Sequence, residues 1–228
     1  MGLEHSRIVE LPNDIDNKYE YYKINWTSEN IATNRVNEID KGKCTLGSKI
    51  ISRAANHILN YLKSNKLDQI KILEPYAGNG VASNIIYKKL AEEFPNLIMK
   101  STDIQNLSDY IDDSSYPVEF DLNSVDTIEK YSQDGFNILM MVSPPPGSGN
   151  RNYDYCDYFA IKSWSQIPSA ELLIFVGELG ASDGCEGLYD YLIENNPNWS
   201  LEFRKIIYSC IDSLGGPCEK EVFIFKKK

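Results

Sequence analysis

Short apolar runs alternate with stretches of helical periodicity over most of this chain. The runs are rich in Ile, Leu, Val, Phe and Met and are bounded by turn-forming residues, a pattern typical of buried strands. They fall at residues 69–74, 97–103, 116–122, 136–142 and 171–177. Between them, apolar residues recur at the spacing of a helix face. These helices are expected at residues 47–64, directly after residue 80, up to about residue 164, and around 188–192.

This alternating order of strands and helices predicts a parallel sheet with crossover helices. Residues 136–142 are almost continuously apolar, as expected of a central strand that is covered on both faces. Two late runs, 201–210 and 221–225, are joined by a short glycine-proline link that favours an antiparallel pair. We therefore expect an α/β fold with a doubly wound, seven-stranded, mostly parallel sheet, an antiparallel last strand and helices on both faces.

The first 45 residues lack sustained periodicity but contain a group of aromatic side chains, Tyr19, Tyr21, Tyr22 and Trp26. We expect residues 1–45 to form an N-terminal arm or lid outside the core, and residues 46–228 to form one α/β domain. Two interpretations of the arm are open. It is either a flap whose aromatic rings stack on a substrate, or an extension packed on the surface of the domain.

Composition narrows the classes of partner. With 228 residues, of which 42% are hydrophobic, the chain is long enough to bury one substantial core. Its formal net charge of −10 argues against a general surface for duplex nucleic acid, because such surfaces neutralise phosphates with Lys and Arg. A local basic patch, or a partner subunit that supplies positive charge, stays open.

Cysteine usage and hydropathy bear on location. The 5 cysteines are widely spaced and form no CxxC pair, which indicates neither a disulfide scaffold nor a zinc site and favours the reducing cytoplasm. No stretch approaches the roughly 18 consecutive apolar residues of a membrane span, so no membrane partner is expected. The abundance of Asn, Ile, Lys, Asp and Tyr hints at an AT-rich genome, such as that of a bacterium or a large DNA virus. For a viral protein the expected location is the host cytoplasm.

The stretch from Glu74 to Ser83 combines a strand end, a glycine loop and a helix start. Gly78 and Gly80 can adopt positive φ and let a ligand approach the backbone closely. The free N–H groups of the following helix face the same loop. This arrangement suits a nucleotide-like ligand, and the carboxylate of Glu74 favours a ribose hydroxyl or a cation over a phosphate.

Two more acids follow the next two strands. Asp103 ends the run 97–103, and in a βαβ unit its strand lies beside the strand of Glu74, so both carboxylates can share one ligand. Asp121 lies at the end of the run 116–122, next to Leu122, and is suited to an exocyclic amine. Each acid also has a plain structural interpretation, as a turn or cap residue.

The fourth strand ends in Ser143-Pro144-Pro145-Pro146. Prolines fix φ and lack an amide donor, so this loop presents rigid outward carbonyls at the edge of the sheet. Such carbonyls, with the Ser143 hydroxyl, can accept hydrogen bonds from an NH₂ group; a structural proline turn is the alternative. The aromatic residues that follow suggest stacking on a ring, although a helix that buries Tyr155 explains part of the same pattern.

Together these residues resemble the class I S-adenosylmethionine-dependent methyltransferases, over roughly residues 45–228. Glu74 and the segment 76–80 are similar to the first motif of that superfamily, Asp103 to its ribose-binding acid and Asp121 to its adenine-contacting acid. The segment 43–45 is faintly similar to a cofactor-contacting stretch of amino-methylating members. The resemblance implies a Rossmann-like methyltransferase domain that binds S-adenosyl-L-methionine through Thr45, Glu74, Tyr76, Ala77, Gly78, Asn79, Gly80, Asp103, Ile104, Asp121, Leu122 and Ser143.

The proline loop resembles the (Asn/Asp/Ser)-Pro-Pro-aromatic motif of enzymes that methylate amino groups, in the serine form typical of cytosine N4 enzymes. The resemblance implies catalytic roles for Ser143, Pro144 and Pro145, with the acceptor amine on a single-stranded or flipped base or on a protein side chain. The motif departs from the family at Pro146, which stands where an aromatic ring stacks the target. The expected acceptor-binding residues are therefore Pro146 and its aromatic replacements Tyr153, Tyr155 and Tyr158.

Two other functions stay open. Gly78-x-Gly80-x-x-Ser83 is one residue from the dinucleotide fingerprint of dehydrogenases, but it lacks the third glycine and carries Glu74 where that fingerprint has no acid. Alternatively, Pro146 marks a lost acceptor site, and the chain is a catalytically inactive methyltransferase-like domain that serves as a regulatory or structural subunit.

Overall fold

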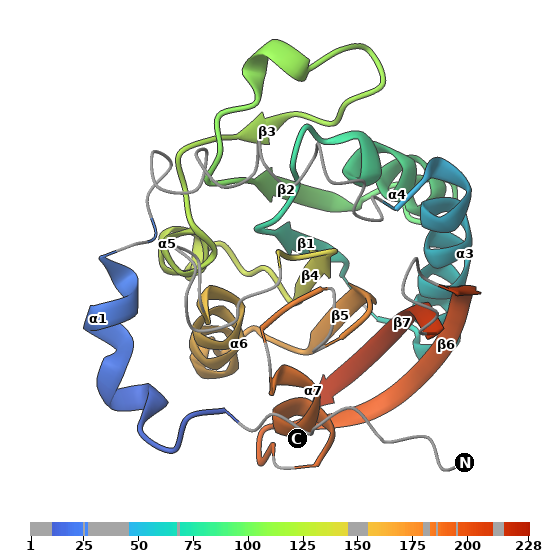
Figure 1. The fold of residues 1–228 in the computed structure, drawn as a ribbon. Helices are drawn as coiled ribbons and strands as arrows, with labels where there is room; N and C mark the ends of the chain where they lie inside the picture. The colour runs from blue at the N-terminus through green and yellow to red at the C-terminus, as the bar shows by residue number, and fades with distance from the viewer. Residues whose placement is uncertain are drawn as a thin grey trace.

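A computed structural model describes most of the chain. The described residues are 11–24, 26, 46–67, 69–145, 155–179, 183–185, 187–194, 196–211 and 217–228. Thr45, Pro146 and Tyr153, which are expected to bind cofactor or acceptor, lie outside these ranges. The described part folds around one twisted sheet that is flanked by helices (Figure 1).

In the described part of the chain, the sheet has seven strands in the order β3-β2-β1-β4-β5-β7-β6. The strands are β1 (Lys71–Glu74), β2 (Ile98–Thr102), β3 (Val118–Glu119), β4 (Ile138–Val142), β5 (Leu172–Gly177), β6 (Trp199–Ile211) and β7 (Pro217–Lys227). β1 to β5 pair in parallel, and β7 runs antiparallel to both of its neighbours, β5 and β6. The expected fold class is confirmed, including the antiparallel last strand.

Helices cover both faces of this sheet (Figure 1). On one face lie α3 (Ser48–Asn65) and α4 (Val81–Ala91), and on the other lie α5 (Ser124–Tyr131), α6 (Cys156–Gln166) and α7 (Leu188–Ile193). Three short elements complete the described helices, namely η1 (Ile15–Lys18), α1 (Tyr19–Lys23) and η2 (Ser108–Tyr110).

The apolar continuity of the central strands follows from this layering. On β4, Leu139 and Met141 belong to the core on the α5 and α6 side, whereas the alternate residues Ile138 and Met140 belong to the core on the α3 and α4 side. Successive side chains of a strand point to opposite faces, so both sets must be apolar when both faces are covered. All four side chains are 0% exposed.

The third strand is shorter than the run 116–122 predicts. Pro117 has no amide donor, and the N–H of Tyr116 donates to the carbonyl of Gly80, 3.0 Å away, instead of extending the ladder. At the other end, Asp121 has φ 65° and leaves the strand conformation. Only Val118 and Glu119 pair with β2. This short strand therefore brings the Asp121 turn close to the end of β2.

The N-terminal segment is part of the core in the residues that are described. Ile15, Tyr22 and Trp26 are 5%, 8% and 4% exposed, and they pack with the residues of α6. The rings of Tyr22 and Tyr155 meet edge to face with centroids 5.0 Å apart. These side chains therefore pack on the domain and complete the apolar cover of α6. The division of the chain at residue 45 stays a prediction.

Candidate functional site

The loop between β1 and α4 is tightly held. The N–H of Ala77 donates to the carbonyl of Thr102 at 3.0 Å, and the N–H of Gly80 donates back to Ala77 at 2.9 Å. Gly80 has φ 79°, and a Cβ there would lie 2.3 Å from the carbonyl oxygen of Tyr116. A side chain is therefore excluded at Gly80 both by conformation and by space. At Gly78, with φ 58°, a Cβ would meet nothing within 4 Å, so open space lies beside this part of the loop.

Glu74 lies at the carboxyl end of β1 and is 0% exposed. Its Oε2 accepts a hydrogen bond from the Ser101 hydroxyl at 2.8 Å. Its Oε1 and the nearby Ser83 Oγ are buried, and neither has a hydrogen-bond partner among the described residues. Burying polar atoms without partners costs free energy, so this pair is suited to a ligand or to water.

Burial raises the pKa of Glu74 to about 7. The hydroxyls of Ser83 and Ser101 oppose this shift, and the carboxylate of Asp103 adds to it. Ser101 acts through a hydrogen bond to Oε2, whereas Ser83 lies near the carboxylate outside hydrogen-bonding geometry. A buried acid that is half ionised near neutral pH is typical of functional sites, and a cation beside it would favour the charged form.

Asp103 follows β2 and is 1% exposed. Its Oδ2 accepts from the N–H of Gly78 at 2.8 Å, and its Oδ1 accepts from the N–H of Gln105 at 2.9 Å. Its own N–H donates to the carbonyl of Glu119. The structure thus brings Asp103 to the glycine loop, as the sequence predicts. Its carboxylate orients the loop backbone, and binding of ribose hydroxyls stays a prediction.

The other expected cofactor residues differ in burial, and Asn79, in the glycine loop, is half-buried. Asp121 is exposed and Leu122 is half-buried. Ile104 is 8% exposed and belongs to the core on the α5 and α6 side. The hydroxyl of Tyr76 donates to Ser124 Oγ at 2.8 Å, and burial raises the pKa of this phenol. Direct cofactor contacts of these residues stay predictions.

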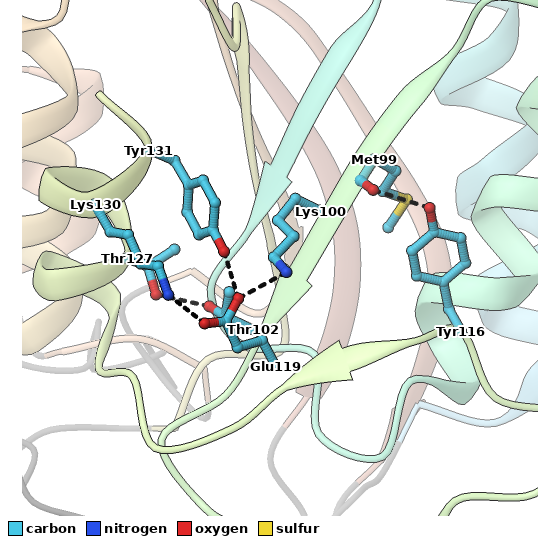
Figure 2. A network of polar contacts seen from close by, with 8 residues as sticks. All are labelled: Met99, Lys100, Thr102, Tyr116, Glu119, Thr127, Lys130 and Tyr131. Atoms are coloured by element: carbon cyan, nitrogen blue, oxygen red, sulfur yellow. Dashed lines mark hydrogen bonds and ion pairs between the residues drawn. The ribbon is translucent and has the colours of Figure 1, made fainter. Parts of the chain in front are cut away.

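A network of polar contacts anchors β3 to its neighbours, as Figure 2 shows. The carboxylate of Glu119 is bound by Lys100 of β2 at 2.7 Å, and also by Lys130 and Tyr131 at the end of α5. Hydrogen bonds from these three side chains hold the pKa of Glu119 at about 2. On the other side of β2, the Tyr116 hydroxyl donates to the carbonyl of Met99 at 2.9 Å. The network fixes the strand that precedes the Asp121 turn.

The residues at the carboxyl end of β4 adopt an unusual conformation. Ser143 has φ 49°, a region that is costly for a residue other than glycine and that occurs preferentially at functional sites. Its N–H donates to the carbonyl of Val176 at 2.8 Å, and its hydroxyl is hydrogen-bonded to Asp183 Oδ1. The carbonyl of Pro144 accepts from the N–H of Gly184 at 2.9 Å. Pro144 is buried, whereas Ser143 and Pro145 are half-buried.

The aromatic residues expected to bind the acceptor are packed on α6. Tyr155, at the N-cap of this helix, is 6% exposed and lies against Tyr22. Tyr158 is 5% exposed, and its hydroxyl donates to Asp16 Oδ1 at 2.9 Å. These contacts are those of core residues, so the acceptor-binding role of either tyrosine stays a prediction.

Sequence reasoning missed the partners of Ser143. Asp183 lies in the connection after β5, and its Oδ2 is 2.6 Å from the ammonium of Lys220 on β7. One signal was present in the sequence. Every second residue of a strand points to the same face, so Lys220 lies on the face of β7 where Val222 and Ile224 are buried. The sequence therefore places a lysine on an apolar face. A buried lysine requires an acidic partner.

Within the described ranges, no group of three or more His, Cys, Asp or Glu side chains could hold a metal ion. No described helix combines the length and the apolar character needed to cross a membrane.

No family model and no curated protein matches this chain. Among solved structures, it is similar to an rRNA methylase from Streptococcus thermophilus, with 14% identity and a TM-score of 0.46 over 75% of this chain and 95% of the other. A second similar structure is a SAM-dependent methyltransferase from Agrobacterium tumefaciens, with 13% identity and a TM-score of 0.44. That match covers 76% of this chain and 62% of the other, so the chain spans less than two thirds of that protein.

A third similar structure is the plantazolicin methyltransferase BpumL, in complex with SAH and a pentazolic desmethylPZN analogue. It is 10% identical, with a TM-score of 0.49 over 93% of this chain and 99% of the other.

Proposed function

We propose that this protein is an S-adenosylmethionine-dependent methyltransferase that acts on an amino group. The observation that carries the proposal is Glu74, a buried acid at the end of β1, because one of its oxygens has no hydrogen-bond partner among the described residues. It stands next to a glycine loop with open space at Gly78 and to the buried Asp103. The order of the strands places these groups at the carboxyl ends of β1 and β2, where doubly wound sheets bind nucleotides.

The charged side chains of the site fit this cofactor better than a cofactor that carries several phosphates. The two carboxylates favour a cation and ribose hydroxyls, and they oppose a diphosphate. S-adenosylmethionine supplies an electrophilic methyl group on a sulfonium. Glu74, Asp103 and the loop backbone would bind and orient it, with Asp121 and the adjacent Leu122 at the adenine end. Little acid or base chemistry is needed, so positioning and exclusion of water are the main tasks of the protein.

The acceptor would bind beside β4, the neighbour of β1 on the other side. The oxygens of Ser143 and Pro144 would accept hydrogen bonds from its amine and raise its nucleophilicity as the nitrogen lone pair leaves conjugation. The Pro144 carbonyl already accepts from Gly184, but a carbonyl has a second lone pair. A base acceptor would have to be single-stranded or flipped, and the net charge of −10 favours a short segment or a partner subunit with positive charge.

The test is methyl transfer from isotopically labelled S-adenosylmethionine to panels of RNA, DNA and protein, read by mass spectrometry. We expect label on an amino group of one class, and a Ser143→Ala protein that transfers methyl more slowly than wild type. The matched control is Ser132→Ala, which removes an exposed hydroxyl bonded to its own helix end. A Ser143→Ala protein as fast as wild type would refute the acceptor role.

A second candidate is a methyltransferase-like domain that binds the cofactor without catalysis and serves as a regulatory or structural subunit. The internal hydrogen bonds of both Ser143 and Pro144 favour it, because they occupy part of the acceptor site. Cofactor binding without transfer to any acceptor in the panels would select this candidate.

A further inference from the structure

The Ser143 hydroxyl has a fixed hydrogen-bond direction. Its partner is Asp183 Oδ1, and a carboxylate can only accept. Ser143 must therefore donate its single proton to Asp183. The lone pairs of its oxygen remain, and Ser143 is half-buried, not enclosed.

Lys220 forms a buried ion pair with Asp183. The distance from Nζ to Oδ2 is 2.6 Å, and the side chains of Lys220 and Asp183 are 1% and 6% exposed. Burial lowers the pKa of Lys220, but the charge and the hydrogen bond of Asp183 outweigh this, so the pKa is raised. The carboxylate of Glu178 lies 3.7 Å from the same ammonium. Asp183 is the nearer counter-ion of a lysine that stays protonated.

Backbone hydrogen bonds also fix the position of Asp183. Its Oδ2 accepts from the N–H of Glu178 at 2.7 Å, and the next residue, Gly184, donates to the carbonyl of Pro144. A Cβ on Gly177 would lie 2.7 Å from Asp183 Oδ2, so only glycine leaves room for the carboxylate. These contacts hold Asp183 and Gly184 against Ser143 and Pro144.

We propose that Asp183, paired with Lys220, is a positioning residue that makes Ser143 a pure hydrogen-bond acceptor toward the methyl acceptor. This rests on the proposed function. The lone pairs of Ser143 then meet an N–H donor favourably. They repel a group that offers only lone pairs, such as a carboxylate or a phosphate oxygen. Asp183 thereby selects amines against anionic oxygen nucleophiles without touching the substrate itself.

The first test needs no methyl acceptor. Melting temperatures are measured for wild type, Ser143→Ala, Asp183→Asn and the double variant, all without ligand. Because the two side chains share a charge-assisted bond, we expect the double variant to lose at least about 2 °C less than the sum of the single losses. Losses that add within error would overturn the proposal, whether or not the protein is a methyltransferase.

Asp183→Asn leaves Lys220 buried without its nearer counter-ion, which could prevent folding. In that case the four proteins of the cycle all carry Lys220→Met. They are Lys220→Met itself and its combinations with Ser143→Ala, with Asp183→Asn, and with both. The same non-additivity is expected against Lys220→Met, and the same additivity would overturn the proposal.

The second test separates positioning from mere stability. With any acceptor that wild type methylates, Asp183→Asn is expected to lower kcat roughly tenfold or more and to leave the Kd for S-adenosylmethionine unchanged. Asn137→Ala is the control. Asn137 is buried at the opposite end of β4 and bonds to Gln69 and Lys71, so its loss destabilises the chain away from the site. If kcat falls equally in both variants, Asp183 is only structural. If wild type methylates nothing, the proposed function fails. The melting temperatures of the four proteins in the first test still show whether Ser143 and Asp183 are coupled.

Discussion

The carboxylate of Asp103 accepts a hydrogen bond from the N–H of Gly78, with Oδ2 and the amide nitrogen 2.8 Å apart. Together with the bond from the N–H of Ala77 to the carbonyl of Thr102, it joins the end of β2 to the glycine loop after β1. Asp103 also accepts a hydrogen bond from the N–H of Gln105, so one side chain orders the backbone on both sides of the candidate cofactor site.

Replacing Asp103 by Ala should therefore reduce both stability and ligand binding. Two N–H groups lose their acceptor, and we expect the free energy of unfolding to fall by about 1–3 kcal/mol in denaturant titrations. Affinity for S-adenosylmethionine should fall with it. Asp109→Ala is the control, because Asp109 is exposed, and it should stay within about 0.5 kcal/mol of wild type. Unchanged stability and affinity in Asp103→Ala would contradict its role.

Gly80 is expected to be intolerant of any side chain. Gly80→Ala forces a Cβ to 2.3 Å from a backbone oxygen at φ 79°, so we expect a loss of at least about 2 kcal/mol in unfolding free energy. Gly78→Ala meets only the conformational cost, about 1 kcal/mol, because the space beside it is open. The measurement compares the unfolding free energies of the two variants. A Gly78→Ala protein less stable than Gly80→Ala would disprove this account of the loop.

The N-terminal segment offers two adjacent tyrosines with opposite environments. Tyr22 is 8% exposed and Tyr21 is 68% exposed. Tyr22→Ala should cost about 3 kcal/mol of unfolding free energy, because it leaves a cavity against Tyr155, whereas Tyr21→Ala should change it by less than about 0.5 kcal/mol. Equal effects would show that this segment does not belong to the core in solution.

The pKa of Glu74 predicts a pH dependence of stability. In the folded chain this pKa is about 7, against an ordinary value of 4.5. Between these values the folded state keeps a proton that the unfolded state has lost. The stabilisation is therefore complete below pH 4.5 and is lost as pH rises through 7, by about 3 kcal/mol in all.

The measurement compares unfolding free energies of wild type and Glu74→Gln across this pH window. Since Gln does not ionise, the difference between the two proteins should shrink or reverse as pH rises from 4.5 to 7, and it should be constant above that. A cationic ligand favours the ionised acid, so affinity for S-adenosylmethionine should rise with pH through the same window. Parallel pH profiles of the two proteins would exclude Glu74 as the titrating group.

The sheet was predictable because its pattern is local. Leu139 and Met140 face opposite cores, so the run of apolar residues that covers both faces is visible in the sequence. The acids Glu74 and Asp103 were predictable as well, because each ends such a run. The third strand was overestimated, because Pro117 and the bond from Tyr116 to Gly80 depend on how the glycine loop packs.

The support of Ser143 could not be predicted in the same way. Asp183 and Lys220 are 37 residues apart in sequence, and only the pairing of β7 with β5 brings them together. Likewise, the pattern of Tyr22 and Trp26 does not reveal that their rings pack on α6, because that contact joins distant segments. Long-range polar pairs and aromatic packing need the fold before they can be read.

The most direct test of the central claim is calorimetric titration of the wild-type protein with S-adenosylmethionine and, separately, with NAD. We expect S-adenosylmethionine to bind at one site per chain, NAD not to bind, and affinity to be lost in Glu74→Gln and Asp103→Ala. Tight binding of NAD without binding of S-adenosylmethionine would contradict the account.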